Sequence, residues 1–66
     1  MKKIHLSNFR KKFDDKSYQI VREAIARNTF AASEININKI IDCISDPIVK
    51  KNFTHWSDGY DFAVLS

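Results

Sequence analysis

The sequence predicts a single α+β domain that is mostly α, in which three to four short helices pack around a central Ile-rich helix. A small two- or three-stranded antiparallel sheet formed by the chain ends completes this fold class. The central stretch 36–44 has isoleucines on one side of a helix. These are Ile37, Ile40, Ile41 and Ile44. Short stretches at 3–6 and 60–64 alternate polar and apolar residues, as strands do.

The small size of the chain limits both its stability and its activities. Its 66 residues suffice for one domain, residues 1–66, with a stability of roughly 3 to 5 kcal/mol. The lone Cys43 cannot form an internal disulfide, so we expect a cytoplasmic protein. The basic start lacks the apolar run of a signal peptide, and no stretch is apolar enough for a membrane span.

The amino-terminal region is predicted to form a short strand followed by a short helix. The strand covers 3–6, and Ser7 could cap the helix after it. Phe9 and Phe13 are four residues apart and would share its buried face, while the basic residues 10–12 point mostly to solvent.

A second helix is predicted to begin at the acidic residues Asp14 and Asp15 and at Ser17, because caps and acids favour a helix start. Its apolar face comprises Tyr18, Val21, Ala24 and Ile25. We expect it to end near Asn28, and the alternative is a longer helix through Ala32.

The central helix should stop before Pro47, and a further helix should follow from 47 to about 53 with Asp46 as its cap. Three residues are candidate caps for the central helix: Ser33, Asn36 and Asn38. The buried positions expected in the last helix are Ile48, Val49 and Phe53.

The carboxy-terminal region allows two arrangements around the turn signal Asp58-Gly59. In one, residues 53–56 and 60–64 form a hairpin. In the other, a single strand at 60–64 pairs with residues 4–6, so that the two chain ends close the sheet.

Charge is unevenly distributed along the chain. Five basic residues precede the first acid, whereas three acids against one lysine give residues 33–46 a net charge of −2. The five are Lys2, Lys3, Arg10, Lys11 and Lys12. A basic segment of this kind is the strongest electrostatic signal in the sequence.

Catalytic and cofactor signatures are weak. Cys43, His55 and Asp58 could form a thiolate triad, but their spacing has no specificity and a small buried thiol is the simpler interpretation. One cysteine and two histidines, His5 and His55, do not provide the paired ligands of a zinc site. A single glycine excludes phosphate loops. We therefore expect no enzyme activity, no metal and no cofactor.

The first functional hypothesis is a non-enzymatic regulatory protein that binds DNA or RNA through its basic amino-terminal face. The candidate nucleic-acid-binding residues are Lys2, Lys3, Arg10, Lys11, Lys12, Asn36, Asn38, Lys39, Lys50 and Lys51. In outline, the helices before and after residue 33, followed by a hairpin wing, resemble a helix-turn-helix architecture. The acidic character of the second of these helices argues against that arrangement.

The alternative hypothesis is a protein-directed inhibitor, antitoxin or adaptor of the phage or mobile-element type. It would bind its protein partner through an aromatic carboxy-terminal surface, or form a homodimer. The candidate interface residues are His55, Trp56, Tyr60 and Phe62.

Overall fold

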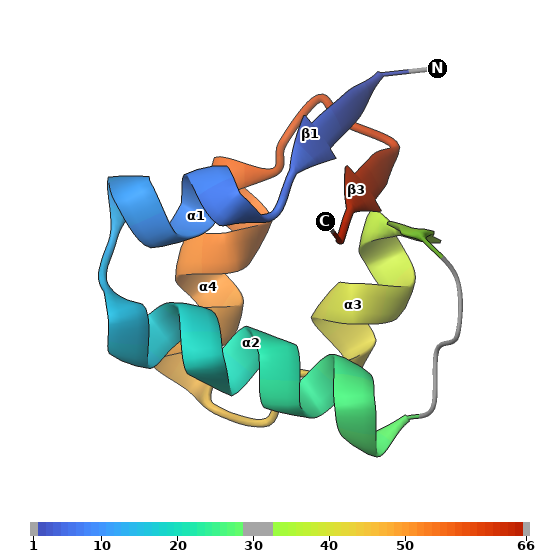
Figure 1. Cartoon of the computed structure of the whole chain (residues 1–66). Helices are drawn as coiled ribbons and strands as arrows, with labels where there is room; N and C mark the ends of the chain where they lie inside the picture. Colours follow the sequence, from blue (N-terminus) through green and yellow to red (C-terminus); the bar gives the residue numbers. More distant parts are fainter. Residues whose placement is uncertain (1, 29–32, 66) are drawn as a thin grey trace.

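The computed structural model describes residues 2–28 and 33–65 (Figure 1). Along the chain, the elements are β1 (Lys3–His5), α1 (Ser7–Lys12), α2 (Asp15–Arg27), β2 (Glu34–Asn36), α3 (Ile37–Cys43), α4 (Pro47–Trp56) and β3 (Phe62–Val64). The predicted α+β, mostly helical class is confirmed. In this part of the chain, no helix has the length and apolar character needed to cross a membrane.

The three strands form one sheet with β3 in the centre, between β1 and β2. Ala63 is the middle of the sheet, in register with Ile4 on one side and Ile35 on the other. β2 is antiparallel to β3, but β1 is parallel to it, so the sheet is mixed and not purely antiparallel as predicted. Because nearly the whole chain lies between β1 and β3, no tight turn forces these two strands to run in opposite directions.

The chain ends meet in this sheet, which confirms the single-strand arrangement of the carboxy-terminal region. Leu6 N donates a hydrogen bond to Val64 O at 2.9 Å. The alternative hairpin is wrong because residues 53–56 belong to α4. A turn links α4 to β3. Within this turn, Gly59 has a positive φ of 88° that residues other than glycine rarely adopt.

Strand β2 was not predicted. With Ser33, Asn36 and Asn38 as candidate caps, the sequence leaves these three residues at or before the start of the central helix, and a three-residue strand is too short to show alternation. It exists because β3 offers it a partner.

Helix α2 ends at Arg27, with Asn28 directly after it, which agrees with the predicted end near Asn28. The alternative of a helix through Ala32 concerns residues outside the described ranges.

Three helices begin with a side-chain cap. Asp14 Oδ1 accepts a hydrogen bond from Ser17 N at 2.7 Å, which starts α2. Asn36, one of the three candidates, accepts from the backbone amide of Asn38 at 2.9 Å and caps α3. Asp46 caps α4 through the amides of residues 48 and 49, at 2.9 and 3.1 Å. The predicted cap at Asp46 is therefore confirmed.

The predicted cap at Ser7 is wrong. Helix α1 follows Leu6, which already has helical backbone angles, and no side chain caps it. Leu6 is fully buried, so core packing places the start of this helix.

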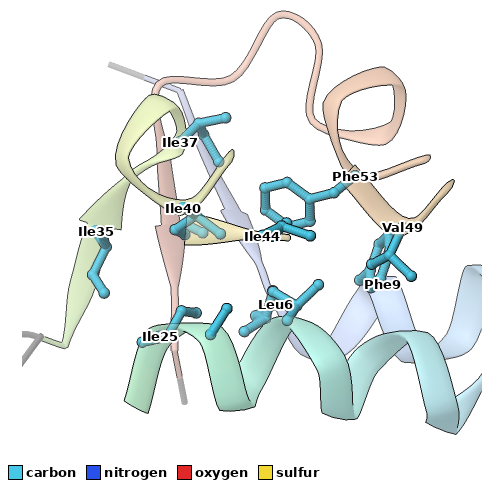
Figure 2. Close-up of a cluster of buried hydrophobic side chains, with 12 residues drawn as sticks. Leu6, Phe9, Ile25, Ile35, Ile37, Ile40, Ile44, Val49 and Phe53 are labelled. Carbon is cyan, nitrogen blue, oxygen red and sulfur yellow. The ribbon is translucent and has the colours of Figure 1, made fainter. Parts of the chain in front are cut away.

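The core lies where the helices converge on one another and on the sheet (Figure 2). Its buried apolar residues are Leu6, Phe9, Val21, Ala24, Ile25, Ile35, Ile37, Ile40, Ile44, Val49, Phe53 and Ala63. Ile40 is completely buried, whereas Ile41 is only partly buried at the edge of this cluster. The isoleucine face of α3 is thus central to the fold, as predicted.

The prediction that Ile48 is buried is wrong, because 72% of its surface is exposed. Val49 and Phe53, four residues apart, face the core, and Trp56 continues the same side of α4. Ile48 is rotated by about 100° from Val49 around the helix and therefore faces solvent.

Candidate nucleic-acid interface

Helix α1 presents lysines to solvent because its aromatic side faces inward. Phe9 is fully buried, while Lys11 and Lys12 are exposed in the last turn. The negative end of the helix dipole favours cations at that position. These two lysines are therefore available to an anionic partner.

Arg10, in contrast, is held by α2. Its Nε lies 2.6 Å from Asp15 Oδ1, and its guanidinium carbon lies 4.6 Å from the centre of the Tyr18 ring. Half of its side-chain surface remains exposed. The adjacent carboxylate neutralises much of the charge that an incoming phosphate would meet.

The remaining basic residues of the amino-terminal segment lie on the sheet. Lys3 Nζ is 3.0 Å from Glu34 Oε2, which links the two outer strands. Lys2 is exposed, and its backbone amide donates to Asp61 Oδ2 at 3.1 Å. The five basic residues that precede the first acidic residue are thus divided in space between the sheet region and α1.

A groove runs between the end of α1 and the outer side of α4. Its volume is about 640 Å³. It is lined by Phe13, Lys51, Asn52, Thr54, His55 and Asp58. We call it the α1–α4 groove. Lys11 and Lys12 immediately precede Phe13 in the chain and are exposed, while the lysine in the lining itself is Lys51.

The aromatic part of the groove is Phe13, which is 36% exposed. Its ring centroid lies 4.7 Å from that of Phe9, at an interplanar angle of 40°. Phe9 in turn contacts the rings of Phe53 and Trp56. Phe13 is therefore the outermost member of a packed aromatic cluster.

The α1–α4 groove was only partly anticipated from sequence. Lys51 and His55 were candidates for different functions, and Asn52, Thr54 and Asp58 were not proposed as nucleic-acid contacts. The available signal was helical spacing, since positions 51, 54, 55 and 58 follow the pattern i, i+3, i+4, i+7 of one helix face. Their proximity to Phe13 depends on tertiary packing.

Two of the candidate contacts expected at the start of the second helix of a helix-turn-helix, Asn38 and Lys39, lie on α3, whereas Asn36 ends β2. Asn38 and Lys39 are exposed there, but the Asn36 side chain is engaged in capping. α3 has only seven residues, and along the chain strand β2 separates it from α2, whereas a helix-turn-helix joins its two helices by a short turn. The predicted hairpin wing is wrong, because residues 53–56 are helical.

The four aromatic residues of the alternative interface do not form one exposed surface. His55 and Tyr60 are exposed, Tyr60 by 39%. Trp56 and Phe62 are half-buried, and Trp56 packs against Phe9 and Phe53.

The groups considered for chemistry are dispersed. Cys43 is partly buried on α3, and the loss of solvent there, together with the negative charge of Asp42, raises the pKa of its thiol. His55 and Asp58 line the α1–α4 groove, and Cys43 is not part of its lining. Within residues 2–28 and 33–65, no three His, Cys, Asp or Glu side chains gather in a metal-binding arrangement.

In comparisons with protein-family models, with curated proteins and with solved structures, the chain matches none at a significant level. Its function is therefore inferred from its own residues.

Proposed function

We propose that this chain is a small, non-enzymatic nucleic-acid-binding protein of a regulatory kind. The observation that supports this function best is that Lys51 and the partly exposed ring of Phe13 line the same groove. Lys51 lines the α1–α4 groove, and the exposed Lys11 and Lys12 directly precede Phe13 in the chain. Lysines bind phosphates without regard to sequence, and each neutralised phosphate releases counterions.

The other candidate contacts contribute less in this proposal. The charged nitrogens of Lys3 and Arg10 each lie within 3.0 Å of a carboxylate oxygen. An incoming phosphate would have to compete with Glu34 and Asp15 for them. Lys2, Lys50 and the exposed α3 residues Asn38 and Lys39 are assigned supporting roles.

We propose a cytoplasmic site of action, since a single cysteine cannot form an internal disulfide and a reducing compartment suits it.

We favour nucleic acid over the protein-directed inhibitor, antitoxin or adaptor. That alternative needs an exposed aromatic surface, and Trp56 and Phe62 are both half-buried. The homodimer belongs to the same alternative, because it would use the same surface.

Fluorescence anisotropy with labelled single-stranded DNA, duplex DNA and RNA tests the proposal. With about three phosphate contacts, affinity should fall roughly 20- to 40-fold as salt rises from about 50 to about 200 mM. K51A should weaken binding and reduce the slope of log affinity against log salt by about 0.7 to 0.9.

K16A is the matched control, because it also removes one exposed lysine but from α2, and Lys16 is not among the candidate contacts. It should change affinity much less than K51A. Absence of binding to every nucleic acid at low salt would refute the proposed function.

A further inference from the structure

We infer that the α1–α4 groove holds an unpaired base against the ring of Phe13, so that the ligand is a single-stranded nucleic acid. This inference rests on the proposed function and specifies the form of nucleic acid. It follows from the packing behind Phe13, from the polar residues that line the groove with it and from Lys51 in the same lining.

The Phe13 ring is fixed before any ligand arrives. Its backbone N donates to Phe9 O at 3.0 Å, and the two rings lie 4.7 Å apart. Phe9 is fully buried and packs edge-on against Phe53 and Trp56, at 5.4 and 5.1 Å between centroids. The packed cluster thus supports Phe13 from the inside, and its exposed part is left for the groove. A ring held in this way loses little conformational entropy when a base stacks on it.

The polar residues from α4 and the following turn suit the edges of a base. Asn52 has both donors and acceptors in its amide, His55 offers ring nitrogens, and Asp58 is an acceptor. Bases of single strands are recognised by this combination of an aromatic stack and hydrogen bonds to their edges. The Thr54 hydroxyl is already used, since it donates to Lys50 O at 2.7 Å.

The size and charge of the groove fit a nucleotide better than a bare anion. Its volume of about 640 Å³ lies within the usual range of small-ligand sites, roughly 300 to 1,000 Å³. Lys51 provides a positive charge in the lining, and the exposed Lys11 and Lys12 precede Phe13 in the chain. Asp58 is the opposing charge in the lining, which disfavours a phosphate directly beside it and favours a base there.

A duplex cannot use this platform, because the faces of its bases are covered by their neighbours. It retains only the phosphate contacts. The chain should therefore bind a single strand more tightly than a duplex of the same sequence, by the contribution of at least one stacked base. Stacking on an aromatic side chain corresponds to about a 5- to 160-fold gain in affinity.

The test compares three ligands of equal length: a single strand, its duplex, and a strand whose sugars lack bases. The wild-type chain should bind the single strand about 5- to 160-fold more tightly than the abasic strand. This comparison needs no variant, so it does not depend on the folding of a mutant.

F13L then removes the aromatic face while keeping an apolar side chain against Phe9. It should lower affinity for the single strand alone, with duplex and abasic binding unchanged. Y60L is the matched control, since Tyr60 is similarly exposed at 39% but does not line the groove. It should bind like wild type, and circular dichroism should show both variants folded.

The outcomes separate this inference from the function on which it rests. If the abasic strand binds as tightly as the normal one, or F13L binds single strands like wild type, the stacking site is refuted while nucleic-acid binding stands. If none of the three ligands binds at low salt, the proposed function fails, and the stacking site fails with it. A protein would then be the ligand to consider for this surface.

Discussion

The rings of Phe9 and Trp56 meet edge to face, with centroids 5.1 Å apart and an interplanar angle of 65°. This contact joins α1 to α4, and Phe9 also packs against Phe13, which lines the α1–α4 groove. Edge-to-face pairs add about 0.5 to 1.5 kcal/mol beyond the burial of their surface. The core and the candidate site are thus stabilised by the same rings.

Replacing Phe9 by alanine should unfold most of the protein. The side chain is fully buried and contacts three other rings, so its loss should cost about 3 to 5 kcal/mol. A domain of this size has roughly that much stability in total. Urea denaturation followed by Trp56 fluorescence measures the loss. F9L, which refills much of the volume, should remain folded, and a stable F9A protein would contradict the structure.

Ile48 and Val49 are adjacent residues with opposite environments, exposed by 72% and 5% respectively. I48A should change the free energy of unfolding by no more than about 0.5 kcal/mol. V49A should lower it by about 2 kcal/mol, because it removes buried apolar surface. Urea midpoints of the two variants provide the comparison, and equal losses would mean that α4 is rotated from its described orientation.

The features predicted correctly from sequence are those that depend on neighbouring residues. The cap at Asp46 and the helix start at Pro47 are local backbone chemistry. The buried isoleucines of α3 follow from helical periodicity alone, which explains why Ile40 was identified. The orientation of α4 does not follow from the sequence, since Ile48 and Val49 are equally apolar and only tertiary packing selects one of them.

The features that were missed depend on residues far apart in the chain. Strand β2 forms because β3 provides backbone partners, and nothing within Glu34–Asn36 signals this. The pairing of Lys3 with Glu34 likewise depends on the sheet. The α1–α4 groove requires Phe13 and Lys51 to be close, and no spacing along the sequence indicates that contact.

Asp46 should contribute measurably to stability through its cap. Its carboxylate accepts hydrogen bonds from the amides of Ile48 and Val49. D46A leaves these donors without that acceptor and should lower the free energy of unfolding by about 1 kcal/mol. D46N keeps an acceptor at the same position and should lower the free energy of unfolding by only a few tenths of the D46A loss. Equal effects of both variants in urea denaturation would show that charge, and not capping, is responsible.

Asp14 should make stability depend on pH in the acid range. The hydrogen bond from the Ser17 amide lowers the pKa of this carboxyl below its ordinary value of 3.8. Because the folded state favours the ionised form, the contribution is complete above the ordinary pKa and is lost as the pH falls through the lowered one. In D14N, which caps without titrating, the urea midpoint should fall less steeply between about pH 6 and pH 2. A parallel decline in both proteins would contradict this assignment.

Cys43 should react slowly with thiol reagents at neutral pH. Partial burial, followed by the negative charge of Asp42, raises the pKa of the thiol above its ordinary value of 9.0. Since the thiolate is the nucleophile, the alkylation rate of the folded protein should rise to its plateau only at a pH above that of a small free thiol. D42N should shift the inflection part of the way down, because burial remains, and denaturant should abolish the difference. If the alkylation rate instead reached its inflection below pH 9.0, the thiol of Cys43 would be activated. That result would contradict the raised pKa that burial and Asp42 give this thiol.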